Sequence, residues 1–277
     1  MSLKIEVENK GAELMSIKFN NKEMLHNGKE YWDRRAPILF PMVGRLRDDK
    51  TIINNKEYSI PQHGFAKDMK FELIQETENT KIYFTRSNLE TLKMYPFEFE
   101  LYVTYEIQGD TLSVKYKVIN KDKKDMLFGI GGHPGFKIDS KQEEYYFELE
   151  KIENEIEFME VAGKYISNTP SKNLLIDGKI IDIKEDSFIN DAIMIKNFKS
   201  KTITLKQNNN KKILEFDISE FPVLGIWSIP NAPFICIEPW FNTADKVIET
   251  GYFKDKEGIK VLKPNEQFNC KFSVRFF

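Results

Sequence analysis

The sequence predicts an all-β fold, a large antiparallel β-sandwich. Apolar or alternating segments with a period of two residues recur along the chain, and this is the spacing of half-buried strands. Aromatic residues make up 13% of the 277 residues, and they favour the pleated surface of a sheet. Helical patterning is poor. So many strands in one chain predict two large sheets packed face to face, with Phe, Ile and Leu between them.

The predicted strands are short segments separated by turn residues. In chain order they are KIEVE, LMSIKF, FELIQE, KIYFT, FEFELYVTYEI, LSVKYKVI, YYFELE, ITLK, ILEFDI, LGIWSI, FICIE and FNCKFSVRFF. Gly109-Asp110 divides the two long central runs and predicts a hairpin, and the asparagine pairs at 20–21 and 54–55 tolerate positive φ. The best helix candidate is 88–94, where Asn88 can cap the start and Pro96 enforces a stop.

Composition limits the classes of protein. Lys and Arg total 41 against 43 Asp and Glu, and 41% of residues are hydrophobic, which excludes a disordered chain and a basic nucleic-acid-binding surface. No Pro/Gly/Ser-rich linker divides the sequence, so we expect a single domain over residues 1–277.

The sequence also predicts a cytoplasmic location. The amino terminus is charged within four residues and has no apolar stretch typical of a secretory signal. No apolar run reaches the roughly 18 residues of a membrane span. Cys236 and Cys270 are too few for a disulfide framework, and we expect both to be small buried hydrophobic residues.

Arginine is concentrated in YWDRRAPILFPMVGRLRDD, which holds four of the six arginines: Arg34, Arg35, Arg45 and Arg47. Its prolines and glycine are unusual inside a regular strand, so we expect a structured loop. Guanidinium groups suit carboxylates, phosphates or vicinal hydroxyls. The alternative is a surface cluster of ion pairs with Asp33, Asp48 and Asp49. That alternative is weaker for Arg45, which follows Gly44 directly after the apolar run.

The three histidines differ in their surroundings. His26 lies in the polar turn EMLHNGKEY and is expected to be solvated. His63 lies in PQHGFA and His133 in GIGGHPGF, where Pro and Gly fix an irregular backbone that a ligand can approach closely. Both are candidates for a functional site. For His133 a bulge-capping role is the alternative.

The best candidate for a proton-transfer carboxylate is Glu238 in PFICIEPW. We expect it to end a buried strand, because the following Pro239 should terminate pairing, and to have a raised pKa through partial desolvation. Trp32, Trp227 and Trp240 offer flat faces that can stack on a sugar, although such residues more often belong to the core. The sequence contains no P-loop, no strand followed by GxGxxG, no HExxH and no GxSxG.

Taken together, these motifs resemble the aldose 1-epimerase (galactose mutarotase) family, in particular a bacterial subgroup found beside lactose and tagatose genes. The resemblance runs from NKGAELMSIKFNNKEMLHNG through QHGFAKD, GGHPGF and NDAIMIKN to LGIWSIPNAPFICIEPW. GGHPGF and CIEPW are the most specific pieces. The resemblance implies a galactose mutarotase-like β-supersandwich and an aldose sugar as substrate. We expect no cofactor or metal, because one acid and one base suffice for this chemistry, and a monomer or homodimer.

Site roles follow from the same resemblance. Glu238 is similar to the general base of the family, His133 to its general acid and His63 to the histidine near the sugar ring oxygen. Arg45 resembles the arginine that binds sugar hydroxyls, and Asp191 in NDAIMI the binding aspartate, with Asn190 and Asp186 as neighbours that could be mistaken for it. Trp240 is a further substrate-binding candidate. Lys67 departs from the family, where HGFAR is commoner.

The chemistry suits these residue types. Interconverting anomers requires a base for the anomeric hydroxyl and an acid for the ring oxygen, and a nearby carboxylate would raise the imidazolium fraction of His133. Two alternatives remain: a mutarotase of hexose 6-phosphates, suggested by the arginine cluster, and a carbohydrate-binding protein that has lost catalysis. A glycoside hydrolase would need a second good carboxylate.

Overall fold

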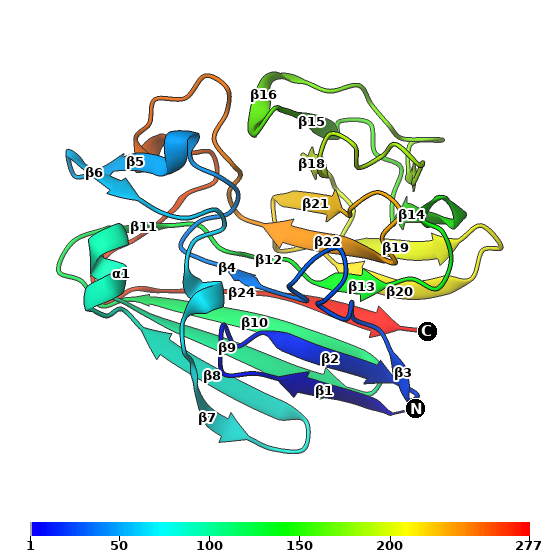
Figure 1. The fold of residues 1–277 in the computed structure, drawn as a ribbon, viewed down its shortest axis with the longest axis horizontal. Coiled ribbons are helices and arrows are strands. Elements are labelled where there is room, and N and C mark those ends of the chain that lie inside the picture. Colours follow the sequence, from blue (N-terminus) through cyan, green and yellow to red (C-terminus); the bar gives the residue numbers. More distant parts are fainter. Residues whose placement is uncertain (1) are drawn as a thin grey trace.

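Two large antiparallel sheets form the body of the molecule in the computed structural model, which describes residues 2–277 (Figure 1). Strands account for 48% of the structure and helices for 7%. The nine-stranded sheet has the spatial order β17 (Ile180–Asp182), β14 (Tyr145–Leu149), β19 (Thr202–Gln207), β20 (Lys212–Asp217), β24 (Gln267–Phe276), β10 (Thr111–Asn120), β9 (Phe99–Gln108), β8 (Thr80–Arg86) and β7 (Glu72–Glu76). The predicted all-β sandwich is confirmed.

The second sheet has eight strands and carries the site described below. Its order is β16 (Tyr165–Pro170), β15 (Glu157–Ala162), β18 (Ile193–Lys196), β21 (Val223–Trp227), β22 (Phe234–Trp240), β12 (Gly131–Gly132) and β4 (Ile38–Leu39), and β13 (Gly135–Lys137) also pairs with β22. Two short strands, β12 and β13, therefore lie along one edge of β22, with a gap between them.

Smaller elements complete the fold. They are the sheet of β1 (Leu3–Val7), β2 (Leu14–Phe19) and β3 (Lys22–Glu23), the pairs β5 (Lys50–Ile53) with β6 (Lys56–Ser59) and β11 (Met126–Phe128) with β23 (Lys260–Leu262), the helix α1 (Leu89–Met94), and four 3₁₀ turns at Arg47–Asp49, Ala66–Asp68, Gln142–Glu144 and Phe253–Asp255. No helix among residues 2–277 is long and apolar enough to span a membrane.

The predicted turns follow the expected chemistry. Gly109 (φ 64°) joins β9 to β10, and both asparagines at 20–21 and at 54–55 have positive φ. The Asn88 side chain accepts hydrogen bonds from the backbone N–H groups of Glu90 and Thr91, so it caps α1 as predicted. The arginine-rich segment is mostly loop, but it contains the two-residue strand β4.

One hydrophobic core lies between the two large sheets. Alternate residues of β9 are buried, and Leu101 and Val103 belong to the same buried cluster as Ile235 and Ile237 of β22. Because side chains alternate along a strand, the other residues of β22 point away from this core. Phe234, Cys236, Glu238 and Trp240 therefore share the outer face of the second sheet, although all are buried there.

The structure corrects the prediction that Pro239 ends the strand. β22 continues through Pro239, and Glu238 pairs with Gly225 inside the strand. The hydrogen bonds of the residues on either side explain why β22 accepts a proline here. Ile237 N donates to Pro134 O, and Phe241 N donates to Ile130 O. The donor missing at Pro239 would face the gap between β12 and β13, so no ladder bond is lost. That gap is where His133 lies.

Candidate active site

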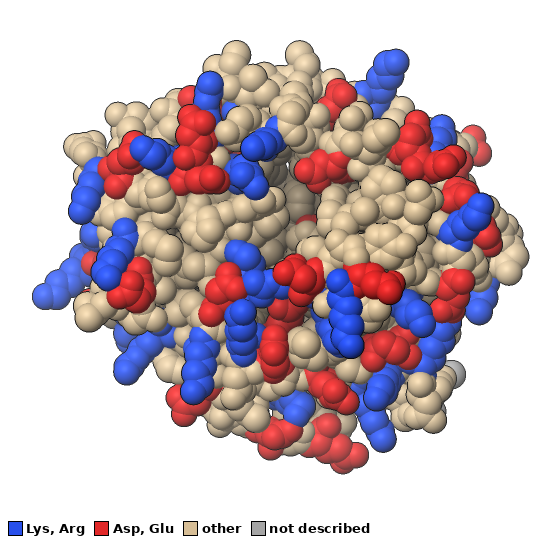
Figure 2. Space-filling model, in the orientation of Figure 1, with Lys and Arg blue, Asp and Glu red and all other residues tan. Residues whose placement is uncertain are grey.

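A cavity of about 710 Å³ opens on the outer face of the second sheet. Residues of β18, β21 and β22 form its floor, and the walls come from segments 32–45 and 61–68 and from the β15–β16 hairpin. The space-filling view shows this face hollowed near its middle (Figure 2). The cavity lining includes every residue that the sequence predicts for the site, namely Glu238, His133, His63, Arg45, Asp191 and Trp240.

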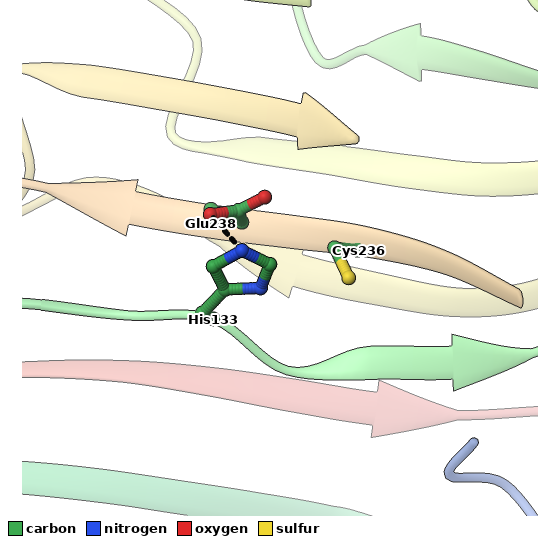
Figure 3. A group of neighbouring side chains, drawn as sticks. All are labelled: His133, Cys236 and Glu238. Atoms are coloured by element: carbon green, nitrogen blue, oxygen red, sulfur yellow. Dashed lines mark ion pairs between the residues drawn. The ribbon is translucent and has the colours of Figure 1, made fainter. Parts of the chain in front are cut away.

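Glu238 and His133 meet at the bottom of this cavity. The His133 Nε2 atom lies 3.1 Å from Glu238 Oε2, and Glu238 is 1% exposed (Figure 3). These two atoms are close but not aligned as a hydrogen bond, so Glu238 Oε2 has no hydrogen-bond partner among the described residues. The other ring nitrogen of His133, Nδ1, has none either. Buried polar atoms left without partners in a cavity are free to bind a ligand.

Three aromatic rings surround His133. Its ring centroid lies 4.8 Å from that of Trp32, 5.5 Å from that of Trp227 and 5.6 Å from that of His63. This burial lowers the pKa of His133 to about 3. The pKa of His133 is thus lowered where a nearby carboxylate was expected to raise it, because the imidazole loses its water and the buried Glu238 itself favours its neutral form.

The pKa of Glu238 is raised well above its ordinary value, as predicted. Burial is the main cause, and the charge of Asp191 adds to it. The neutral forms of Glu238 and His133 are therefore favoured together. The two groups then share one titratable proton, which the Glu238 carboxyl holds. Moving that proton from the carboxyl to Nε2 gives a carboxylate and an imidazolium with no change in the number of protons, so the pair can present either partner as the acid.

His63 is held by the backbone of Gly44, which belongs to a different loop. Its backbone N–H donates to Gly44 O (2.7 Å), and its Nδ1 accepts from Gly44 N (3.1 Å). Burial also lowers the pKa of His63, so the neutral ring carries its hydrogen on Nε2. The turn requires glycine at the next position, because Gly64 has a φ of 70° and an added Cβ would lie 2.1 Å from Phe40 O.

Arg45 and Asp191 both line the cavity, and the charge of Arg45 acts on the Asp191 carboxyl. Arg45 Nη2 donates to Gln62 Oε1 (2.7 Å), and Nη1 is 3.7 Å from Asp49 Oδ1. Asp191 has a φ of 88°, and its Oδ1 accepts from Ala192 N (2.8 Å). Desolvation raises the pKa of Asp191. The second oxygen, Oδ2, makes no hydrogen bond to the described part of the chain.

Trp240 forms part of the floor and is 5% exposed. A Cβ at Gly131 would lie 2.8 Å from its Cδ1, and one at Gly225 would lie 2.8 Å from its Cζ2 and Cη2. The indole therefore fits between two strands that lack side chains at these points. Its Nε1 has no hydrogen-bond partner among residues 2–277.

The other arginines serve the scaffold, and mostly with partners other than the predicted Asp33, Asp48 and Asp49. Arg34 contacts Asp68 (2.6 Å) and Glu13 (3.5 Å). Arg35 donates its backbone N–H to Glu13 (2.7 Å) and a side-chain N–H to Met15 O. Arg47 donates to Asp245 Oδ2 through its backbone and to Val247 O through Nη1. Only the Arg45–Asp49 contact matches the predicted pairs within the described chain.

His26 is buried at 2% exposure, so the prediction of a solvated residue is wrong. Its Nε2 is 2.9 Å from Trp32 O, and its ring centroid is 4.3 Å from that of Phe234. The polar turn folds back onto the aromatic residues beside the cavity, and a local sequence pattern cannot show this. His26 thus supports the position of Trp32, which covers His133.

The family model described as "Aldose 1-epimerase" matches residues 2–258. The chain belongs to the aldose 1-epimerase family. A curated relative, "Protein LacX, plasmid" of Lactococcus lactis subsp. lactis, is 31% identical over 281 residues, which cover 95% of this chain and 92% of that protein. The match confirms the family resemblance, including its lac-associated subgroup.

Solved structures agree with this membership of the aldose 1-epimerase family. A galactose mutarotase related enzyme from Lactobacillus acidophilus superposes with a TM-score of 0.93 at 31% identity, covering 99% of this chain and 94% of that one. A galactose mutarotase-like protein from Lactobacillus casei ATCC 334 gives a TM-score of 0.94 at 29% identity, covering 99% and 97%. The fold is therefore galactose mutarotase-like.

Among residues 2–277, this aldose 1-epimerase family member presents one group of potential metal ligands. His133, Cys236 and Glu238 offer ligand atoms within 4.8 Å of one another (Figure 3). The Cys236 thiol is fully buried in a cluster with Phe234 and Ala232, and it does not line the cavity. Burial raises its pKa well above the ordinary value, which opposes formation of the thiolate that metals bind. These facts favour a packing role for Cys236.

Sequence reasoning missed part of the cavity wall. Lys164, Tyr165 and Ile166 of the β15–β16 hairpin line the cavity, and neither strand has the alternating pattern that would have predicted it. Lys67 also lines the cavity, but its ammonium donates to Gln62 O (2.8 Å) and Gly64 O. It therefore braces the His63 turn.

Proposed function

We propose that this protein is an aldose 1-epimerase that interconverts the α and β anomers of an unphosphorylated hexose. The observation that carries the proposal is the contact between His133 Nε2 and Glu238 Oε2, 3.1 Å apart at the bottom of a cavity large enough for a hexose. An acid and a base in contact in such a place fit a reaction that moves one proton off an oxygen and another onto a nearby oxygen.

In the proposed reaction, Glu238 as carboxylate removes the proton of the anomeric hydroxyl while His133 as imidazolium protonates the ring oxygen. The bond between C1 and the ring oxygen breaks, and the O1–C1 pair becomes a carbonyl. Rotation about C1–C2 turns the aldehyde over, and reclosure returns both protons in exchanged roles. The carboxylate and imidazolium state holds the same single proton as the neutral pair, so it is reached by proton transfer across the contact.

The remaining predicted residues have geometry suited to holding the sugar. His63 presents its Nε2–H, because Gly44 N occupies Nδ1. Arg45 and Asp191, whose Oδ2 makes no hydrogen bond to the described part of the chain, supply donors and acceptors for hydroxyl groups. Trp240 offers an indole beside the acid–base pair. These groups support binding of a polyhydroxylated ring, and the role of each stays a proposal.

The ion pairs and hydrogen bonds of the cavity favour a neutral sugar over a sugar phosphate. Its four basic side chains are Arg34, Arg45, Lys67 and Lys164, and they face the carboxylates Asp33, Asp68 and Asp191 besides the buried Glu238, whose neutral form is favoured. Arg34 is already paired with Asp68, and Lys67 with backbone carbonyls. Binding a phosphate would require free guanidinium or ammonium groups, and most of these are engaged.

Polarimetry tests the proposal. Freshly dissolved α-D-glucose and α-D-galactose, and their 6-phosphates, are followed to anomeric equilibrium with and without protein. We expect faster equilibration of at least one free hexose and a lower kcat/KM for the phosphates. Binding of a sugar without acceleration would favour the carbohydrate-binding alternative. Preference for the phosphates would overturn the proposed substrate class.

A further inference from the structure

A buried ion pair lies behind the wall of the cavity. The side chains of Asp245 and Lys256 are each 2% exposed, and Lys256 Nζ contacts Asp245 Oδ1. Placing two charges in an apolar interior is costly, and such pairs often contribute less to stability than well-packed apolar residues. This pair therefore calls for an explanation other than stability.

Asp245 joins segments that are far apart in sequence. Its Oδ2 accepts from Arg47 N (2.7 Å), and its own N–H donates to Arg45 O (2.9 Å). Its carbonyl accepts from Ile166 N (3.0 Å), at the β16 side of the cavity. The carboxylate thus stands between Lys256 on one side and the backbone of the 45–47 segment on the other.

The 44–47 segment leads directly to the groups proposed to bind sugar. Arg45 belongs to it, and Gly44 N holds His63 Nδ1. Gly44 also packs so closely on the chain before Asp245 that an added Cβ would lie 2.5 Å from Ala244 N and Cα. A shift at Asp245 would therefore move both Arg45 and the Gly44–His63 contact.

We propose that Asp245 and Lys256 are positioning residues for sugar binding. Lys256 fixes the Asp245 carboxylate, and the carboxylate fixes the backbone from which Arg45 and His63 reach the sugar. This inference rests on the proposed function. Glu238 and His133 lie on β22 and in the gap beside it, and neither is joined to Asp245 by a hydrogen bond in the described chain. The pair should accordingly affect affinity and leave the chemical step unchanged.

The test uses Asp245→Asn, in which one amide oxygen must serve both Arg47 N and Lys256. We expect KM, and Kd from calorimetric titration of the free hexose, to rise about 5- to 30-fold, as for one or two lost hydrogen bonds. We expect kcat to change by less than about threefold, because Glu238 and His133 keep their places.

Glu153→Gln is the matched control. Glu153 is also 2% exposed and accepts from the backbone N–H groups of Lys199 and Ser200, but it does not line the cavity. It should lower Tm and leave KM unchanged. Lys256→Gln keeps a hydrogen-bond donor for Asp245, and it provides a second test if Asp245→Asn fails to fold. We expect the KM of this variant to rise as well.

Two results overturn the inference. The first is a lowered Tm with unchanged KM and Kd in both the Asp245 and Lys256 variants, which would make the pair purely structural. The second is a fall in kcat at constant KM. A wild-type protein that neither binds nor equilibrates any hexose would instead refute the proposed function, so the two failures are distinguishable.

Discussion

Burial sets the protonation of the two residues at the bottom of the cavity. Glu238 is 1% exposed, and three aromatic rings surround His133. Each environment favours the neutral form of its residue, and together they leave one proton for two groups. Mutation can test the roles of these two groups separately.

Glu238→Gln and His133→Asn should each slow mutarotation by about 100- to 10,000-fold, the usual range for positioned acid–base groups. Glu238→Gln conserves volume, and His133→Asn shortens a side chain that borders the cavity, so circular dichroism should show that both variants fold. The double variant should be far less impaired than the product of the single effects, because both groups act in one step. A folded single variant with near wild-type rates by polarimetry would disprove the assignment.

The dependence of kcat/KM on pH should show a broad plateau. His133 gains a proton only as pH falls to about 3, and Glu238 keeps its proton above its ordinary range. The pair thus holds one proton between these limits. Activity should fall as pH rises through the raised pKa of Glu238, where the last proton leaves. An acid limb near pH 6.5, where a solvated imidazole titrates, would contradict this reading.

Glu238 should also lower stability as pH rises. Its pKa in the folded protein lies above the value of 4.5 expected for an exposed group, so between these values the folded state binds the extra proton. Each pH unit in this window then lowers the free energy of unfolding by about 1.4 kcal/mol. Gln does not titrate, and the contribution of His133 is common to both proteins.

The Tm of Glu238→Gln relative to wild type should therefore be higher at pH 8 than at pH 5. Thermal unfolding of both proteins across this range measures the difference. A Tm difference that stays constant with pH would show that the carboxyl titrates normally.

The residues of the candidate site and the raised pKa of Glu238 could be predicted from the sequence, but the lowered pKa of His133 could not. His63, His133 and Glu238 are each flanked by Gly, Pro or aromatic residues, which is a local signal. The rings that desolvate His133 belong to Trp32 and Trp227, which are distant in the chain. Only the folded structure brings them together.

At the scale of elements, β21 and β22 show how the floor of the cavity is made. Gly225 pairs with Glu238, and its missing side chain leaves space above the carboxyl and the Trp240 ring. An added Cβ would lie 2.8 Å from the Trp240 ring and 3.3 Å from Glu238 Cβ. β21 therefore contributes to the site by having glycine at position 225, which leaves room for the Trp240 ring.

Gly225→Ala should raise KM, because Trp240 must move, and should lower the free energy of unfolding by about 1–3 kcal/mol, as overpacking does. Sugar titration and chemical denaturation measure the two effects. Gly109→Ala is the control, since it strains a turn with φ 64° but meets nothing within 4 Å. It should reduce stability without changing KM, and an equal KM for both variants would show that the space above Glu238 is unimportant.

Every strand segment predicted from the sequence is a strand in the structure, because long alternating runs carry a strong signal. Half of the strands were not predicted, and the short strands β4, β12 and β13 beside the site are among them. They have two or three residues and are rich in Gly or adjacent to Pro, so no periodicity can develop. The interruption between β12 and β13 is nevertheless the feature that carries His133 and tolerates Pro239.

At the scale of the whole molecule, the fold predicts a specific spectrum. With 48% strand and 7% helix, far-ultraviolet circular dichroism should be dominated by β structure. A helix fraction near the one-third of an average globular protein would contradict the architecture. A single domain over residues 1–277, a cytoplasmic location, and a monomeric or homodimeric state stay predictions of the sequence.

The alternation of side chains in β22 also determines which of its positions can be substituted without disturbing the core. In the stretch FICIEPW, Ile235 and Ile237 fill the space between the sheets, whereas Glu238 and Trp240 line the cavity. Neighbouring residues of β22 therefore have different roles: one set packs in the core, and the other set lines the cavity. A mutagenesis library confined to the cavity-lining positions of β18, β21 and β22 should yield altered substrate preference at a high frequency of folded clones.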